Sequence, residues 1–264
     1  MNYTLGFIGC GNMGGALAQA AAKSLPCQEI AVCDFDENKT QPFKKLGCAV
    51  TTARDIAQNA KFVVLAVKPQ TMENAIEEFS DLLSNRNDAV IITMAAGLSI
   101  RAIRSFIGGE LPTVRIMPNT PVLLGEGMIL YATDKVSSAQ ESLFLSAFSK
   151  AGVFDKIEES AIDAGSALSG CGPAFVYAFA KALQAGGESC GVPKEKAALY
   201  AAQTLRGAAA MLLQFGDPDQ LIKNVCSPGG TTIEGIKSLE KDDLNGVTQA
   251  AVEAAYKRTL ELKR

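Results

Sequence analysis

The stretch YTLGFIGCGNMGGALAQAAA, residues 3–22, decides the fold of the N-terminal half of this chain. Residues 3–8 have the apolar character of a short buried strand, and residues 15–22 form an alanine-rich helical pattern. The glycines between them follow the G-x-G-x-x-G spacing, which allows a tight turn, close approach of a pyrophosphate and close packing of the helix on the strand. The stretch therefore predicts a strand, a turn and a helix that bind a dinucleotide through Gly9, Gly11, Asn12, Met13 and Gly14.

An acidic residue at the end of the next strand supports this interpretation. Residues 29–33 form a second apolar run that ends at Asp34, about 20 residues beyond Gly14, where such folds place a carboxylate that accepts a ribose hydroxyl. Asp34 should repel a 2′-phosphate, and residues 35–38 contain no arginine to neutralise it. We therefore expect NADH to be used at least comparably to NADPH. Arg54, which we place at the end of the next short strand, is the cation that argues for NADPH.

The pattern up to about residue 155 alternates strands with helices. Continuous apolar runs at 62–67, 89–93 and 113–117 are separated by helical patterns at 71–84 and 99–107. This alternation predicts a parallel, doubly wound sheet, with further strands at 127–132 and 153–157 along its far edge. Because the carboxyl ends of such strands line the cofactor crevice, we expect cofactor contacts from Ala66, Val67, Lys68, Pro69 and Asn119.

From about residue 158 the pattern is helical throughout. Helices are expected at 174–184, 194–214, 220–224, 231–239 and 244–262. Alanine and leucine cover most of the circumference of the helix at 194–214, which implies burial on several sides. The predicted fold is an α/β protein, with a Rossmann-like dinucleotide-binding domain at residues 1–157 and an all-α domain at residues 158–264.

The segment SPGGTT, residues 227–232, combines a helix start with hydroxyls and bare backbone. Ser227 fits the N-cap and Pro228 the first helical position, where its missing N–H costs nothing. The two following glycines leave the first amides unshielded, and the next two threonines add hydroxyls beside the positive end of the helix dipole. We expect an anion to be held by Ser227, Gly229, Gly230, Thr231 and Thr232.

Composition and charge exclude several classes of function. The 264-residue chain has a net charge of −3 and scattered basic residues, which argues against a nucleic-acid partner. No apolar run approaches the roughly 18 residues that span a bilayer, and no basic leader precedes the first strand, so we expect a cytoplasmic protein without a membrane partner. Seven cysteines without a C-x-x-C pair indicate reduced thiols rather than a disulfide framework.

The chain contains no histidine. This excludes Ser–His and Cys–His nucleophilic machinery, histidine general acids and the usual histidine-containing zinc sites, and we expect no metal site. Cys10, Cys171 and Cys226 lie near the loops described above and are interpreted as small buried residues rather than nucleophiles. The reactive chemistry is therefore expected to come from a bound cofactor.

With these motifs in place, the chain resembles the pyrroline-5-carboxylate reductase family over nearly its whole length. The resemblance is carried by residues 9–14, 66–70, 95–97, 117–121, 168–174 and 227–232. Cys171 stands where the family usually has serine and Phe175 where it usually has tyrosine. Both departures concern a hydroxyl contact at the head of the helix that follows.

The resemblance implies a reaction, a site and an assembly. The reaction is the reduction of 1-pyrroline-5-carboxylate to L-proline, the last step of proline biosynthesis, by hydride transfer from NADPH or NADH. Ser227 and residues 229–232 would hold the carboxylate and Thr232 would bond the ring nitrogen, which makes Thr232 and Ser227 the catalytic residues. The substrate would lie between the nicotinamide and this loop, and the helical domain would form a homodimer or a larger homo-oligomer. An imine that binds already protonated needs no strong acid, and positioning beside the nicotinamide contributes most of the rate.

Two alternatives remain open. A β-hydroxyacid dehydrogenase or related imine reductase shares the plan of a Rossmann domain followed by helices, but it places a catalytic lysine six residues after the first glycine of a GxG helix head. Counted from Gly170, that position is Val176. A nucleotide-sensing regulator without turnover would be favoured by a degenerate loop at residues 227–232, and this loop is intact.

Overall fold

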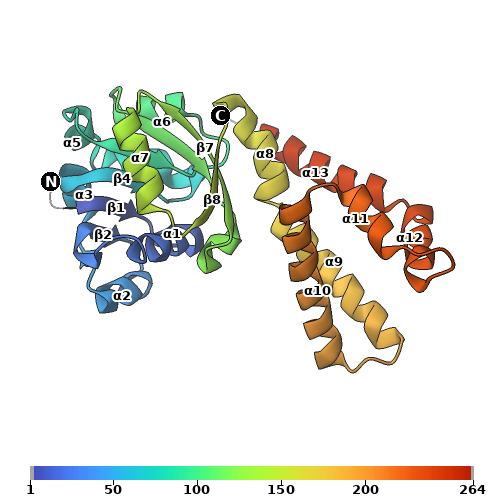
Figure 1. Cartoon of the computed structure of the whole chain (residues 1–264). Helices are drawn as coiled ribbons and strands as arrows, with labels where there is room; N and C mark the ends of the chain where they lie inside the picture. The colour runs from blue at the N-terminus through green and yellow to red at the C-terminus, as the bar shows by residue number, and fades with distance from the viewer. Residues whose placement is uncertain (1–2, 263–264) are drawn as a thin grey trace. The chain divides into compact units, whose positions relative to one another are not determined.

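The computed structural model describes residues 3–262 and divides into two compact units (Figure 1). The first unit contains the chain up to Cys171 together with its end from Ala255, and the second contains residues 172–254. Helix α8 (Ile162–Ser169) therefore clusters with the sheet. The boundary predicted after residue 157 would instead assign α8 to the helical domain.

The first unit is an eight-stranded sheet in the order β3-β2-β1-β4-β5-β6-β7-β8. Its strands are β1 (Tyr3–Ile8), β2 (Ile30–Cys33), β3 (Ala49–Val50), β4 (Ala60–Leu65), β5 (Val90–Thr93), β6 (Thr113–Met117), β7 (Gly127–Asp134) and β8 (Gly152–Lys156). Besides α8, its helices are α1 (Asn12–Ala22), α2 (Glu37–Leu46), α3 (Ala53–Asn59), α4 (Met72–Glu77), α5 (Ser80–Ser84), α6 (Ile100–Ile107) and α7 (Ser138–Ala147). Short 3₁₀ turns occur at Cys27–Glu29, Pro69–Thr71, Thr120–Leu124 and Glu159–Ala161.

The strand pairing confirms the doubly wound α/β fold and adds one antiparallel pair toward the far edge of the sheet. Strands β3, β2, β1, β4, β5 and β6 run parallel. β7, one of the two further strands expected along the far edge, runs antiparallel to β6, with Met117 opposite Leu130. Only residues 118–126 join these two strands, which is too short for the crossover of a dozen or more residues that a parallel pair requires.

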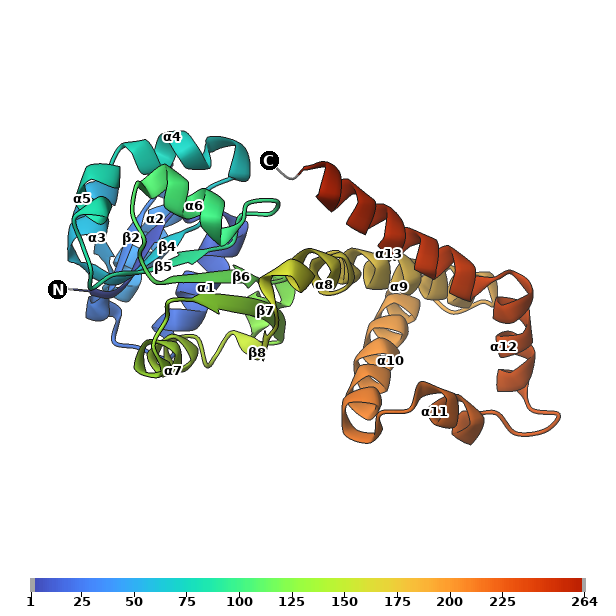
Figure 2. The same ribbon diagram turned by 90° about the horizontal axis from the view of Figure 1, so that it is seen from above.

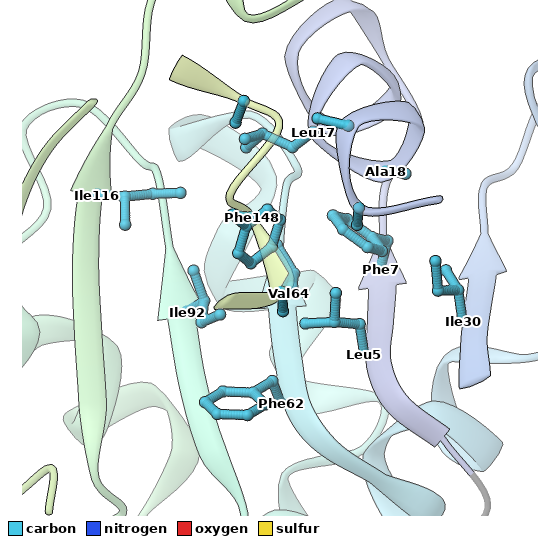
Figure 3. Close-up of a cluster of buried hydrophobic side chains, with 14 of the residues drawn as sticks. Leu5, Phe7, Leu17, Ala18, Ile30, Phe62, Val64, Ile92, Ile116 and Phe148 are labelled. Carbon is cyan, nitrogen blue, oxygen red and sulfur yellow. The ribbon is translucent and has the colours of Figure 1, made fainter. Parts of the chain in front are cut away.

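Both faces of the sheet are covered by helices. Figure 3 shows Leu5, Phe7, Phe62, Val64, Ile92 and Ile116 from four neighbouring strands on one face, where they meet Leu17 and Ala18 of α1 and Phe148. The alternate strand residues, such as Val63 and Ile91, pack on the opposite face against α3, α4, α5 and α6. Burial on both faces explains why the inner positions of these strands form nearly continuous apolar runs rather than alternating with polar residues.

The helix expected at residues 71–84 is interrupted. Phe79 leaves the helical conformation, with φ −142° and ψ 9°, and separates α4 from α5. Its ring is fully buried in the core between the sheet and these two helices. The interruption directs the Phe79 side chain into the core. In a continuous straight helix, this side chain would point in another direction.

The second unit is entirely helical, as expected. Its helices are α9 (Gly172–Ser189), α10 (Lys194–Phe215), α11 (Pro218–Val225), α12 (Thr231–Lys241) and the greater part of α13 (Leu244–Glu261). α9 and α10 lie side by side as a hairpin (Figure 1), and α11 and α12 continue the chain away from α10 (Figure 2). Within the described residues of these five helices, only Ala197 and Ala201 are buried. No helix within residues 3–262 combines the length and apolar content needed to cross a membrane.

Candidate active site

The glycine-rich turn after β1 is shaped for a backbone-bound anion. Gly9 has φ +101°, and a Cβ there would lie 2.6 Å from the Ala66 carbonyl oxygen; a Cβ at Gly14 would collide with the Gly9 carbonyl oxygen. Gly11, the N-cap of α1, has no other atom within 4 Å of its missing Cβ, so its backbone is open. Because α1 has neither a side-chain cap nor an acidic residue in its first turn, the amides at Asn12 and Met13 remain available to an anion.

A cavity of about 430 Å³ lies at this turn. It is lined by Gly9 and Gly11, by Asp34 at the end of β2, and by Ala66, Val67 and Lys68 after β4. The structure therefore brings most of the expected cofactor residues together at the carboxyl ends of three adjacent strands. Pro69 begins the 3₁₀ turn directly after Lys68 and does not line this cavity. The open backbone at Gly11 and a lining drawn from the ends of β2, β1 and β4 fit a dinucleotide.

The Asp34 carboxylate holds the glycine-rich turn in place. Its Oδ2 accepts the Cys10 N–H at 2.7 Å, and its Oδ1 accepts the Asp36 N–H at 3.0 Å and faces the Lys39 Nζ at 3.4 Å. Burial acts to raise the pKa of Asp34, but these N–H groups and the ammonium outweigh it and hold the pKa below its ordinary value. Asp34 is therefore ionised, and most of its acceptor positions are used by contacts that hold the loop.

Lys39 was missed from the sequence. It lines the same cavity from the first turn of α2, which begins at Glu37 after the N-cap Asp36. The N-cap Asp36 is a sequence signal that could have located it. A helix that begins just after β2 keeps the residues of its first turn, including Lys39, close to the end of that strand. Arg54 was placed at the end of a short strand, but it lies in α3, where its guanidinium pairs with Asp81 at 2.8 Å.

Asn119 uses both ends of its amide within the fold. Its Nδ2 donates to the Ser169 carbonyl oxygen and its Oδ1 accepts the Met128 N–H, each at 2.9 Å. The side chain is buried and ties the loop after β6 to α8 and β7. Any contact from this residue to a cofactor would therefore come through its backbone.

The loop at residues 227–230 differs from the expected helix cap. The Gly230 N–H donates to the Ser227 carbonyl oxygen at 3.0 Å, and Gly229 has φ +72°, so Pro228 and Gly229 form the centre of a β-turn. The N-cap of α12 is Gly230, and the prediction that Ser227 caps the helix with Pro228 at its first position was wrong. A proline followed by a glycine at positive φ closes a tight turn before a helix can begin.

The residues expected to hold the substrate nevertheless lie together. Thr231 and Thr232 are the first two helical residues, and a Cβ on Gly230 would lie 2.5 Å from the Ser227 Oγ, which places that hydroxyl beside the helix start. In the part of the chain that the structure describes, the three hydroxyls are not engaged by other side chains or carbonyls. The helix start thus presents free amides and hydroxyls in one segment.

The three cysteines near these loops differ in burial. Cys10 is buried, and burial, followed by the charge of Asp34, raises its pKa to about 12. A thiol with this pKa stays protonated at neutral pH and is a poor nucleophile. Cys171 and Cys226 are half-buried, so they are less enclosed than the buried residues that we expected from the sequence.

Comparisons with known proteins agree with this arrangement. Residues 159–262 match the family model for pyrroline-5-carboxylate reductase dimerisation, and residues 4–97 match that for NADP oxidoreductases dependent on coenzyme F420. A pyrroline-5-carboxylate reductase of Pisum sativum is 35% identical over 99% of this chain and 96% of its own.

Solved structures agree over the whole chain. The reductase structure from Coxiella burnetii is 35% identical, with a TM-score of 0.91 and complete coverage of both chains. The pyrroline carboxylate reductase of Plasmodium falciparum, solved with NADP bound, is 31% identical with a TM-score of 0.89, and covers 100% of this chain and 99% of that one. Full-length identity at this level, together with the glycine-rich cavity and the intact loop before α12, shows that the chain belongs to the pyrroline-5-carboxylate reductase family.

Proposed function

We propose that this protein reduces 1-pyrroline-5-carboxylate to L-proline with NADPH or NADH, the last step of proline biosynthesis. The observation that carries the proposal is that a member of this family keeps both an open glycine-rich turn and a helix start with free hydroxyls. The turn suits a dinucleotide and the helix start suits a small carboxylate.

The N-terminal cavity is the proposed cofactor site. Gly9, Gly11, Asn12, Met13 and Gly14 would hold the pyrophosphate through backbone amides at the start of α1. Ala66, Val67, Lys68, Pro69 and the backbone of Asn119 would continue the site along the carboxyl ends of the neighbouring strands. When bound there, the reduced nicotinamide supplies the hydride.

The segment at residues 227–232 is the proposed substrate site. Its amides and the hydroxyls of Ser227 and Thr231 would hold the carboxylate, because that segment ends at the positive end of the α12 dipole. The Thr232 hydroxyl would bond the ring nitrogen and orient the imine. These residues position the substrate and supply no acid, which suits an imine that is already protonated.

We also propose that the protein works as a homodimer in the cytoplasm. The match to a dimerisation family and the exposed apolar side chains of α9 to α13 support the assembly. All seven cysteines are free thiols, which supports a reducing compartment.

A steady-state assay tests the reaction. Purified protein is mixed with NADPH or NADH, and nicotinamide absorbance and proline are followed with and without 1-pyrroline-5-carboxylate. We expect oxidation of the cofactor and formation of proline only when the imine is present. Flat absorbance and no proline with either cofactor would favour a nucleotide-sensing regulator instead.

A further inference from the structure

One cation lines the cofactor cavity beside the carboxylate that is expected to face the ribose. The Lys39 Nζ lies 3.4 Å from the Asp34 Oδ1, and both residues line the cavity together with Gly9 and Gly11. The Asp34 side chain is only 10% exposed, whereas that of Lys39 is 45% exposed. Lys39 therefore remains partly exposed and lines the cavity while its ammonium compensates the charge of the carboxylate.

Asp34 has little capacity left for a ribose. A carboxylate offers about four acceptor positions, and Asp34 already accepts two backbone N–H groups and faces an ammonium. Its contact with the Cys10 N–H fixes the turn that approaches the pyrophosphate. The compensated charge also weakens the repulsion that a bare Asp34 would exert on a 2′-phosphate.

The other cations near the cavity are less suited to a 2′-phosphate. Arg54 makes two hydrogen bonds to Asp81 and a third to the Glu78 carbonyl oxygen, so three of its five donors are already engaged and its charge is paired. Lys68 follows β4, and the strand order β2-β1-β4 places the whole of β1 between it and the end of β2. Lys39 lies on the β2 side, where the ribose is bound in this fold.

We propose that Lys39 binds the 2′-phosphate of NADPH, and that Asp34 is a positioning residue that braces the glycine-rich turn. An ammonium has three donors, so it can contact Asp34 and a phosphate together. Lys39 is then the residue that allows this chain to accept NADPH despite the acidic residue at the end of β2. The proposal rests on the proposed function only in taking the cavity to be a nicotinamide dinucleotide site.

Binding of two adenosine probes tests the contact without any turnover. Adenosine 2′,5′-bisphosphate and 5′-AMP differ only in the 2′-phosphate, and their affinities for the full-length protein are measured by calorimetry. Lys39→Gln should weaken binding of the bisphosphate about tenfold or more, the loss of a hydrogen bond to a charged group, and change 5′-AMP less than about threefold. Lys39→Arg should retain binding of the bisphosphate.

The matched control is Lys44→Gln, which removes the same charge from α2 at an exposed position outside the cavity lining. It should leave both affinities within about threefold, since Lys44 does not line the cavity and solvent and salt screen an exposed charge. Equal losses of both nucleotides in Lys39→Gln, or no loss of either, would overturn the proposal.

A double-mutant cycle separates contact from neutralisation. If Lys39 only compensates Asp34, the effect of Lys39→Gln on the bisphosphate should vanish in an Asp34→Asn background; if it binds the phosphate, the effect should persist. Loss of the effect would therefore overturn the contact.

Steady-state kinetics gives an independent comparison. In Lys39→Gln, kcat/KM for NADPH should fall about tenfold while that for NADH changes less than about threefold. If no proline forms with any cofactor but the probe result holds, the proposed reaction fails and the role of Lys39 stands. If proline forms but Lys39→Gln weakens both probes equally or neither of them, the proposed reaction stands and the role of Lys39 fails.

Discussion

At the scale of single residues, the hydroxyl of Thr232 is the group most directly tied to the proposed chemistry. Thr232→Val keeps the shape of the side chain and removes the hydroxyl at the second position of α12. We expect kcat/KM to fall about 10- to 100-fold, the loss of one hydrogen bond to a charged group of roughly 1.5–3 kcal/mol, with little change in NADH affinity. Steady-state kinetics and NADH titration check this. If NADH binding weakens as much as turnover, Thr232 belongs to the cofactor site or to the fold.

A second prediction at this scale concerns Cys10, which lies inside the glycine-rich turn. Burial, and then the charge of Asp34, raises the pKa of its thiol to about 12, so almost no thiolate exists at neutral pH. We expect iodoacetamide to leave Cys10 unmodified in the folded protein and to modify it after unfolding in denaturant. Peptide mass spectrometry measures both states, and equal modification rates in the two would contradict a buried, protonated thiol.

At the scale of elements, the turn before α12 depends on a backbone conformation that few residues adopt. Gly229 has φ +72°, where a residue with a Cβ is strained by about 1 kcal/mol or more. Gly229→Ala should therefore lower the free energy of unfolding by about that amount and raise KM for the imine. Gly229→Asn is the matched control, because asparagine tolerates this region and should retain more of both properties. Denaturant unfolding and kinetics on both variants decide, and equal losses would point to crowding rather than backbone strain.

A second prediction at this scale concerns the junction of β7, α7 and β8. The Tyr131 hydroxyl donates to Glu141 at 2.9 Å, and Lys156 contacts the same carboxylate at 2.8 Å. Burial, followed by the bond to Glu141, raises the pKa of Tyr131 to about 12. A raised pKa means that its stabilisation is complete below the unfolded value of about 10 and is lost as the pH rises toward about 12.

The difference between wild type and Tyr131→Phe isolates this titration from other groups. The free energy of unfolding of the wild type should fall more steeply than that of Tyr131→Phe as the pH increases from about 10 to about 12. Denaturant unfolding at several pH values measures both curves. Parallel curves would mean that the hydroxyl does not titrate differently in the folded state.

At the scale of the whole molecule, the helices of the second unit leave many large apolar side chains exposed. Leu213 on α10 is 89% exposed, and Phe215, Val225 and Val247 are also exposed. Surfaces of this kind are typical of obligate interfaces that resemble a divided core. We therefore expect activity to require the dimer.

Light scattering across a dilution series, run beside the activity assay, tests this requirement. Leu213→Glu should shift the protein toward monomer mass and lower activity in parallel. Leu124→Glu, at a leucine of the first unit that is 80% exposed, is the matched control and should keep the dimer mass. A fully active species at monomer mass would refute the requirement.

The features that could be predicted from the sequence are those that depend only on residues close together in the chain. The spacing of Gly9, Gly11 and Gly14 predicts a turn that only glycine can form, and the structure confirms it with the positive φ of Gly9 and the close approaches at Gly9 and Gly14. Apolar periodicity likewise predicts the core strands and the helices of the second unit, because each pattern is local to its own segment. Family motifs at residues 9–14 and 227–232 are local for the same reason.

Only the tertiary structure decided which distant groups meet. The direction of β7 depends on the length of its connection to β6, and the engagement of Asp34 depends on Cys10 and Lys39 converging from two other elements. Asn119 could be placed on a strand-end loop, but its amide meets Ser169 and Met128 only when α8 and β7 pack beside it. Such contacts are fixed by the geometry of packing between segments, and no pattern within one segment contains that geometry.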